Sequence, residues 1–376
     1  MNQQDPKYWL TKIHQLPLDE TIKVMNVCGG HERSITTAGI RSLLPENIEL
    51  VPGPGCPVCI CPEEDIYQAI QLALNHDVIL VAFGDMLRVP VNAPKSEART
   101  LQQAAARGAH VLPIASPMEA VSIARQHPQQ TVVFFAAGFE TTTAPVAAMV
   151  AEGLPDNLLL LLSGRLTWPA VAMLLDSEEP GFDALIAPGH VSTVMGPEEW
   201  QFVIDKHQLP VAVAGFEPVS VLAGLYSVLR QKLENNLFLD NCYAEVAHPG
   251  GNSGARHILS QTLDVVDSLW RGVGTIPASG FALKDSYAKH NVDLQIPREA
   301  DTGRKRIGEM PPGCDCTKVV LGKIYPNQCR LFGEACHPRH PIGPCMVSDE
   351  GACRIWWSNR SQHIEPDKKP ALATQD

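Results

Sequence analysis

Short apolar runs alternate with segments of helical periodicity between about residue 21 and about residue 276. The runs are rich in Val, Ile and Phe and end at Gly or Pro, which is typical of strands buried on both faces. The predicted strands cover residues 22–27, 78–83, 109–114, 131–136, 158–162, 184–187, 211–214 and 243–246. The segments between them predict helices over residues 62–74, 96–107, 117–126, 197–206 and 218–234.

This alternation predicts an α/β protein with parallel sheets covered by helices on both faces. The number of strands suits two Rossmann-like units facing a cleft better than one sheet, and ligands in such folds bind beyond the carboxyl ends of the strands. We expect a helical segment over residues 1–20, a first unit over 21–125, a second over 126–280, and a small cysteine-rich domain over 281–376.

The character of the chain changes after about residue 285. Helical periodicity fades, Pro and Gly become frequent, and six cysteines fall within forty residues. A segment with so little apolar periodicity needs another source of order, and a metal centre would supply it. The polar tail from about residue 362 is expected to fray.

Composition narrows the class of protein. With 45% apolar and 19% charged residues the chain can bury sizeable cores. Its net charge of -11 argues against a nucleic-acid surface and an electrostatic membrane anchor. The N-terminus lacks the pattern of a secretory signal, and the apolar runs are too short to span a bilayer, so we expect a soluble cytoplasmic protein.

Eleven cysteines are the outstanding feature of the composition. Four lie between Cys28 and Cys61, one is isolated at Cys242, and six lie between Cys314 and Cys353. In a reducing compartment, clustered cysteines indicate metal or redox chemistry more often than a disulfide scaffold.

The first motif is Cys28-Gly29-Gly30-His31, at the end of a predicted strand and before a helix expected to start near Ser34. Two glycines allow a sharp turn, and the amides of a following helix favour a thiolate at Cys28. A thiolate beside an imidazole can bind iron, act as a nucleophile or exchange disulfides. The plainer interpretation is a buried cysteine next to a tight turn.

The second motif is Cys56-Pro57-Val58-Cys59, followed by Cys61 and Pro62. A Cys-x-x-Cys pair before a helix start is typical of a dithiol/disulfide couple, with the helix terminus stabilising the thiolate. Half of a zinc site is the competing interpretation, although no second pair with finger spacing follows closely. The pattern assigns no role to Cys61.

The third set consists of the six cysteines near the carboxyl end. Four thiolates can hold a [4Fe–4S] cube, which would leave two of the six unused. The spacing also permits a zinc site with four thiolates. The set comprises Cys314, Cys316, Cys329, Cys336, Cys345 and Cys353.

Three glycine turns after predicted strands each carry a polar side chain: Glu140 in GFETT, His190 in PGHVS and Glu217 in GFEP. Taken singly, each is more typical of a helix cap or a satisfied turn. Three at strand ends favour a shared pocket. The chain has no Walker-type phosphate loop and no Gly-x-Ser-x-Gly elbow, so kinase and hydrolase functions have little support.

The motifs CGGH, GPGCPVC, FGDMLRVP, GFETT, PGHVS, GFEP and CRLFGEAC…CMVSDEGAC together resemble the HypD family of hydrogenase maturation proteins, from about Val24 to about Trp357. The resemblance implies a scaffold that assembles Fe(CN)2CO, the iron portion of a [NiFe] active site. It also implies two partners, a HypC-type chaperone that shares the iron and a HypE-type cyanide donor.

Carried over to this chain, the resemblance implies that Cys28 binds the iron, with His31 beside it, and that Cys56 and Cys59 form the thiol pair. The implied ligands of the [4Fe–4S] cluster are Cys316, Cys329, Cys336 and Cys353, with Cys345 and Cys314 in reserve. A thiol pair near a cluster can exchange electrons with a bound iron, and soft thiolates suit that metal. We therefore expect Cys28, Cys56 and Cys59 to approach one another in the cleft.

The chain departs from the family pattern around these motifs. Glu32 and Arg33 replace a threonine and a second histidine, Arg165 falls in an altered Ser-x-His-Lys stretch, and Ser220 replaces an acid. Two other functions stay open on sequence grounds. One is a dithiol/disulfide oxidoreductase that acts on a protein partner through its iron–sulfur cluster, and the other is a structural zinc protein.

Overall fold

Two separate parallel sheets form the body of the protein in the computed structural model, which describes residues 3–298 and 310–359. One sheet has five strands in the order β2-β1-β7-β8-β9, and the other has four in the order β4-β3-β5-β6. Two further strands, β10 and β11, form an antiparallel hairpin. The predicted α/β class with parallel sheets is confirmed. The strands are β1 Ile22–Cys28, β2 Ile48–Gly55, β3 Val78–Phe83, β4 Val111–Ile114, β5 Thr131–Gly138, β6 Leu158–Gly164, β7 Ala184–Pro188, β8 Val211–Ala214, β9 Leu239–Asn241, β10 Leu263–Trp270 and β11 Gly274–Leu283.

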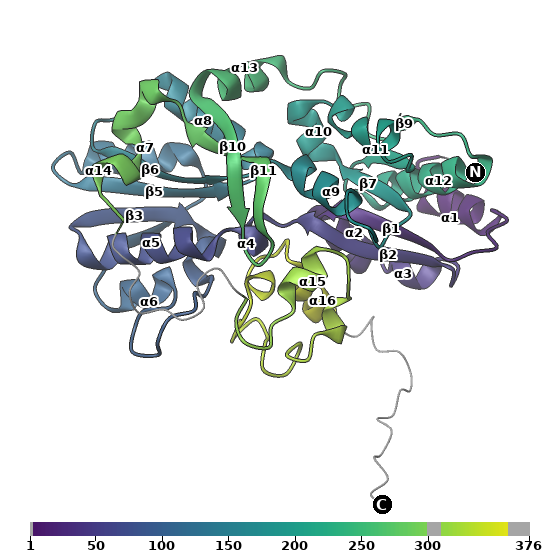
Figure 1. Ribbon diagram of the computed structural model, residues 1–376, viewed down its shortest axis with the longest axis horizontal. Helices are drawn as coiled ribbons and strands as arrows, with labels where there is room; N and C mark the ends of the chain where they lie inside the picture. The colour runs from purple at the N-terminus through teal and green to yellow at the C-terminus, as the bar shows by residue number, and fades with distance from the viewer. Residues whose placement is uncertain (1–2, 299–309, 360–376) are drawn as a thin grey trace, which may run out of the picture.

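Helices cover the sheets and connect the strands, as Figure 1 shows. The α-helices are α1 Pro6–His14, α2 Gly29–Thr37, α3 Ile40–Leu43, α4 Pro57–Ile60, α5 Glu63–Asn75, α6 Leu101–Ala106, α7 Pro117–Gln126, α8 Glu140–Glu152, α9 Thr167–Leu175, α10 Gly189–Met195, α11 Phe202–Asp205, α12 Pro218–Glu234, α13 Ser253–Thr262, α14 Val292–Gln295, α15 Cys316–Val320 and α16 Ala352–Ser358. The short 3-10 helices are η1 Gly84–Arg88, η2 Pro197–Trp200, η3 Asp285–His290, η4 Pro326–Gln328 and η5 Pro344–Met346.

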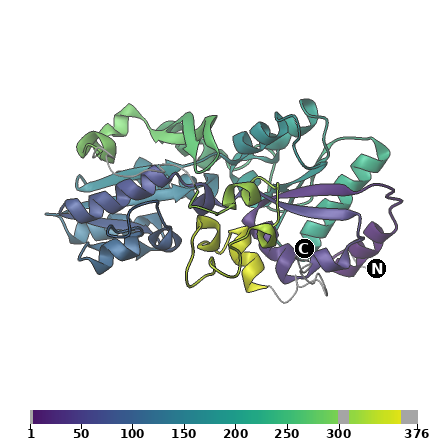
Figure 2. The same ribbon diagram turned by 60° about the horizontal axis from the view of Figure 1, so that its bottom comes forward.

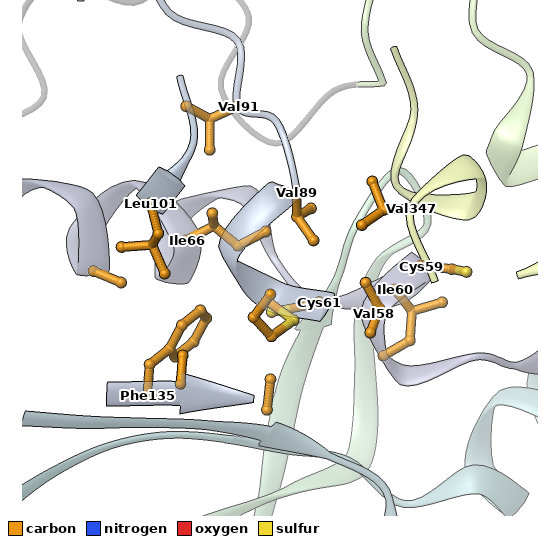
Figure 3. Close-up of a cluster of buried hydrophobic side chains, with 14 of the residues drawn as sticks. Val58, Cys59, Ile60, Cys61, Ile66, Val89, Val91, Leu101, Phe135 and Val347 are labelled. Atoms are coloured by element: carbon orange, nitrogen blue, oxygen red, sulfur yellow. The ribbon is translucent and has the colours of Figure 1, made fainter. Parts of the chain in front are cut away.

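The four-stranded sheet has an apolar cluster on each face. Ile79, Val81 and Phe134 point to one face, while Leu80 and Phe135 point to the other. Figure 3 shows part of the second cluster, where Phe135 lies under the helical residues Ile66 and Leu101. Successive side chains along a strand point to opposite faces of the sheet. Because both faces are apolar here, every position of the strand is apolar, and these runs predicted buried strands correctly.

The division of the chain between the two units differs from the predicted one. The chain builds β1 and β2 in the five-stranded sheet, then all of the four-stranded sheet, and then returns to add β7, β8 and β9. A break near residue 125 is therefore wrong, because β3 pairs with β4 before that position and with β5 after it. The prediction assumed that chain order follows spatial order, whereas strand pairing depends on which apolar faces meet.

The predicted boundaries at residues 20 and 281 also shift. Helix α1 packs on α12 of the five-stranded unit, so the N-terminal segment belongs to that unit. Beyond residue 281, α14 packs on β6, and Asn291 bridges to Leu160 of that strand. The cysteine-rich segment that we describe starts only at Met310 and ends at Asn359; the tail from residue 362 lies outside the described residues.

Some predicted elements differ in extent. Residues 243–246 form a turn after β9 rather than a strand, because the Asn241 side chain accepts a hydrogen bond from the Tyr243 amide and donates one to the Ala247 carbonyl. The predicted helix 197–206 is divided into η2 and α11. The predicted helix 96–107 begins at Leu101, where the Thr100 hydroxyl caps the first turn.

The β10–β11 hairpin runs along the junction of the two units towards the cysteine-rich segment with α15 and α16 (Figure 1). Figure 2 shows the same segment against the middle of the molecule, where the two units meet. Within the described ranges, no helix combines the length and the apolar character needed to cross a membrane.

Candidate functional site

Cys28 ends β1 and caps the N-terminus of α2, where its Sγ accepts a hydrogen bond from the Gly30 amide at 3.4 Å. The helix starts at Gly29 rather than near Ser34, so both glycines lie in its first turn. A Cβ atom at Gly29 would lie 2.2 Å from the backbone oxygen of Glu350. Glycine at this position therefore lets the cysteine-rich segment approach Cys28.

The pairing of β1 with β2 brings the first two sequence motifs together. Cys28 stands opposite Gly55 in the sheet, and Cys56 follows directly. A narrow cavity is lined by both Cys28 and Cys56, and by Cys345 and Glu350 from the cysteine-rich segment. Since parallel strands end at the same sheet edge, the register alone places these two cysteines side by side.

Cys56 and Cys59 are joined by a disulfide in the structure. Cys56 caps α4, and its Sγ accepts a hydrogen bond from the Cys59 amide at 3.2 Å. Both side chains are buried. The pair thus has the geometry of a dithiol/disulfide couple at a helix N-terminus.

A second cavity, of about 80 Å³, is also lined by Cys28. It can hold two or three water-sized groups, at about 30 Å³ for each. Both α/β units and the cysteine-rich segment contribute to its wall. The lining residues are Cys28, Gly55, Pro57, Phe139, Thr141, Thr142, Thr167, Pro188, His190, Val191 and Glu350.

Two of the three glycine turns predicted to share a pocket reach this second cavity, through Thr141 and Thr142 of GFETT and through His190 of PGHVS. The third turn does not line the cavity, but its Phe216 ring stacks on His31 at 4.8 Å between centroids and lies 4.3 Å from the ring of His190, which does. Glu217, predicted to act in the pocket, is exposed at the start of α12 and does not line it.

His31 is completely buried and lines neither cavity, and its Nε2 lies 2.9 Å from the Ala214 carbonyl oxygen of β8. Burial lowers the pKa of His31 to about 4, so the ring is neutral at physiological pH. In that form Nε2–H donates to Ala214 and Nδ1 keeps its lone pair. His31 therefore ties α2 to β8 and supports Phe216.

Glu140 is buried beneath the second cavity rather than lining it. Its carboxylate accepts hydrogen bonds from the amide of Thr167 at 2.6 Å and from the hydroxyl at 2.7 Å. Burial raises the pKa of Glu140 to about 7. Because Thr167 lines the cavity, these hydrogen bonds let Glu140 fix the position of a residue in the cavity wall.

The electrostatics of Cys28 differ from the expected ones. Burial raises the pKa of the Cys28 thiol to about 12, the negative charge of Glu350 adds to this, and the amides of Gly30 and His31 only partly oppose it. The helix terminus by itself therefore does not yield a thiolate. A bound metal cation would stabilise one, since metal binding displaces the thiol proton.

Glu350 is the main residue of the site that the motifs did not single out. It borders both cavities at Cys28. Its side chain stays accessible at the rim, yet the surrounding protein desolvates the carboxylate and raises its pKa, with a further contribution from Asp85 and an opposing one from Arg33. Its only sequence signal was its position within CMVSDEGAC.

The cysteine-rich segment gathers a second group of sulfur atoms. The Sγ atoms of Cys316, Cys345 and Cys353 all lie within 4.8 Å of one another, and all three residues are buried. Cys314 adds a fourth thiol, with its Sγ 3.2 Å from that of Cys316. A buried set of soft donors this dense fits a thiolate-bound metal centre, either an iron–sulfur cluster or a single zinc ion.

The predicted cluster ligands are only partly brought together. Cys316 and Cys353 belong to the close group, whereas Cys329 and Cys336 do not. Cys336 accepts a hydrogen bond from the Ile342 amide at 3.3 Å. The adjacent Gly343 lies against the sulfurs of Cys314 and Cys316, so Cys336 stands next to the group. Cys345, held in reserve, lies within it.

A continuous apolar core connects the two sulfur sites. It includes Cys59 and Cys61 on one side and Cys316, Cys345 and Cys353 on the other. Helix α4, which carries Cys59, packs against η5, which carries Cys345. Figure 3 shows Cys59 and Val347 on facing segments of this core.

Two of the departures from the family pattern have structural partners. Glu32 is buried and accepts hydrogen bonds from Arg41 at 2.7 Å and from the indole of Trp356 at 2.6 Å. This links α2 to α16. Arg165 donates to the carbonyl oxygens of Gly164 and Leu269 and lies 3.7 Å from Asp65, so it fixes β6 against β10.

Comparison with known proteins shows that nearly the whole chain matches the model of one protein family. The family model HypD, described as "Hydrogenase formation hypA family", matches residues 5–360. The chain is 37% identical to the hydrogenase maturation factor HypD of Escherichia coli strain K12 over 355 residues, which cover 92% of this chain and 91% of that protein.

Two other relatives come from different organisms. A putative hydrogenase expression/formation protein of Methanocaldococcus jannaschii is 38% identical over 345 residues, 91% of this chain and 93% of that protein. The hydrogenase maturation factor HypD of Azotobacter vinelandii is 36% identical over 346 residues, 89% of each chain.

Proposed function

The chain belongs to the HypD family of hydrogenase maturation factors, and from that premise we propose that it binds an iron ion at Cys28 and serves as the scaffold on which the Fe(CN)2CO unit of a [NiFe] active site is assembled. The observation that carries the proposal is the position of Cys28, which lines two cavities together with Glu350. Cys56 lines one of these cavities, and His190 lines the other.

In this proposal the iron is the cargo and the chain supplies its surroundings. Cys28 is the thiolate ligand, since soft sulfur donors suit low-spin iron. The 80 Å³ cavity beside it gives room for diatomic ligands. His190 and Glu350 present polar atoms at the rim, and Glu140 positions Thr167 in the wall.

The carboxyl-terminal cysteines hold a [4Fe–4S] cluster, which supplies one-electron transfer when bound. The buried, closely spaced thiols fit such a group. We retain Cys316, Cys329, Cys336 and Cys353 as its ligands, as the family resemblance implies. Cys316 and Cys353 belong to the close group of sulfurs, and Cys336 stands next to it.

The Cys56–Cys59 disulfide takes up two electrons and two protons to give two thiols, and releases them when it re-forms. The dry core between this pair and the cysteine-rich segment supports electron exchange between the two sulfur sites. The partners in this proposal are a HypC-type chaperone that shares the iron and a HypE-type protein that donates cyanide. We propose that the work takes place in the cytoplasm.

The test is an infrared spectrum of the full chain, produced anaerobically and purified together with its small chaperone. We expect absorption bands of bound cyanide and carbon monoxide in the wild type and their complete loss in Cys28→Ala. Cys242→Ala is the matched control, because Cys242 lies in a turn away from both cavities, and its bands should persist. Bands of unchanged strength in Cys28→Ala would refute the proposal.

The disulfide itself favours a second candidate, a dithiol/disulfide oxidoreductase that acts on a protein partner. This function needs Cys56 and Cys59 but no iron at Cys28. Cys28→Ala separates the two functions, since disulfide turnover survives in an oxidoreductase while iron assembly fails in a scaffold.

A further inference from the structure

Arg271 lies at the turn of the β10–β11 hairpin and is 1% exposed. Its amide donates a hydrogen bond of 2.9 Å to the carbonyl oxygen of Ile60, the residue between Cys59 and Cys61. The next residue, Gly272, abuts the cysteine-rich segment, since a Cβ there would lie 2.2 Å from Thr317 Oγ1. The hairpin thus carries Arg271 between the two sulfur sites.

The guanidinium group of Arg271 is only partly satisfied. Nη2 donates to the carbonyl oxygen of Pro90 at 2.8 Å, while the buried Nε and Nη1 have no acceptor among the described residues. Buried donors are nearly always paired, so two unpaired ones on one arginine point to an acceptor outside the protein chain. Arginine keeps its charge even when buried.

The groups that act electrostatically on this cation come from three parts of the chain. Glu63 belongs to α5, Cys61 precedes it, and Cys316 and Cys314 belong to the cysteine-rich segment, where their thiols would become negative on binding a metal. Arg271 is therefore a buried positive charge bonded to Ile60 of the apolar core that also contains Cys59, Cys61 and Cys316.

We propose that Arg271 stabilises the reduced state of the iron–sulfur cluster held by the carboxyl-terminal cysteines, through its charge and its two free donors; this inference rests on the proposed function. Reduction adds one electron to a centre whose thiolate ligands are already negative. A cation and N–H donors at low dielectric stabilise that added charge and raise the reduction potential. Removing the cation, with Glu63 left in place, makes reduction less favourable.

Arg165 provides a matched control in the same region. It is also buried, but Nε, Nη1 and Nη2 all donate to carbonyl oxygens, and Asp65 compensates its charge. Asp65 lies 3.6 Å from Arg298 as well, so it keeps a cationic partner when Arg165 is replaced.

The experiment is a redox titration of the full chain, reconstituted anaerobically with iron and sulfide, with dithionite as the reductant and the electron paramagnetic resonance of the reduced cluster as the signal. Arg271→Gln should make reduction at least tenfold less favourable, about 59 mV lower for one electron. Arg271→Lys, which keeps a charge, should lie between this variant and the wild type. Arg165→Gln should titrate like the wild type.

An unchanged potential in Arg271→Gln would overturn the inference and leave the proposed function intact. Loss of the cluster in Arg271→Gln with retention in Arg271→Lys supports the need for the charge. Loss in both variants would assign Arg271 a purely structural role and overturn the inference. A wild-type chain that binds no four-iron cluster would instead refute the proposed electron-transfer function, and this inference with it.

Discussion

The two parallel sheets and the cysteine-rich segment of residues 310–359 are ordered by different forces. In β7 and β8 every residue is buried, and each sheet has an apolar cluster on both faces. The cysteine-rich segment has only short helices, and α15 and α16 bury thiols among their apolar residues. Apolar burial orders the sheets. The segment has little regular structure of its own, and we expect its order to depend on a metal centre held by its cysteines and on docking to the sheets.

The difference matters because the less regular region completes the site. It supplies Glu350 to the cavities at Cys28 and Trp356 to the buried Glu32. The sheet edge fixes Cys28, and the cysteine-rich segment lies against it. Under the proposed function, loading of the second sulfur site would be coupled to the shape of the first.

Removing the iron should produce the largest difference in hydrogen-exchange protection between the cysteine-rich segment and the sheets. After chelation of the reconstituted chain, we expect the amides of residues 316–358 to exchange hydrogen at least about a hundredfold faster, because the centre contributes to their folding. The strands β5 and β7 should keep their protection. Hydrogen exchange followed by mass spectrometry measures both. Equal loss of protection in the sheets would contradict the comparison.

Single cysteine replacements test which sulfurs order the segment. Cys329→Ser should lose most of the iron of the reconstituted protein, whereas Cys345→Ser should retain it, because the proposed cluster ligands include Cys329 and not Cys345. Iron and sulfide analysis together with the visible absorption of the cluster gives the answer. The reverse result would assign the cluster to the close group around Cys345.

A cavity in the four-stranded sheet should destabilise the frame without affecting the cluster. Leu160→Ala removes a fully buried side chain from β6 and should lower the free energy of unfolding by about 2–5 kcal/mol. Urea unfolding followed by circular dichroism measures this. Leu294→Ala, at a side chain 64% exposed, should stay within about 0.5 kcal/mol of the wild type. Loss of cluster absorption in Leu160→Ala would show that the regions are not independent.

Weakening the contact between the two regions should have the smallest effect on the free energy of unfolding, and this effect should depend on pH. Glu32→Gln weakens the hydrogen bond that joins α2 to Trp356 of α16 and removes the ion pair with Arg41 of α3, and it should cost about 1–3 kcal/mol at pH 7. Burial pushes the pKa of Glu32 upwards, but Arg41, Trp356 and Asn26 together hold it below its ordinary value of 4.5. The carboxylate therefore contributes fully above pH 4.5, and its contribution is lost as the pH falls through the lower folded-state pKa.

Urea titrations of both proteins between pH 3 and pH 7 test this, and the difference between them should shrink at the acidic end. Glu49→Gln is the control, because its ion pair with Lys23 is solvent-exposed and should contribute less than about 1 kcal/mol. A difference between wild type and Glu32→Gln that does not change with pH would show that the carboxylate charge is not what joins the regions.

The sequence determined those parts of the protein that depend on neighbours along the chain. The strand over residues 78–83 and the helices over 117–126 and 218–234 form as predicted, because the apolar period and the Ser116 capping box are local signals. The spacing of Cys56 and Cys59 likewise sufficed to predict a pair that can form a disulfide. The family followed from motifs that are contiguous in the sequence.

Only the tertiary structure decided how distant segments combine. Glu350 reaches Cys28, and Arg271 comes between the two sulfur sites, because separate elements pack at the junction of the two sheets. The interleaved order of the strands was equally hidden, since any apolar strand can pair with another until the packing of all faces selects one arrangement. Local patterns specify the elements, and the burial of their shared surfaces specifies which residues meet at the site.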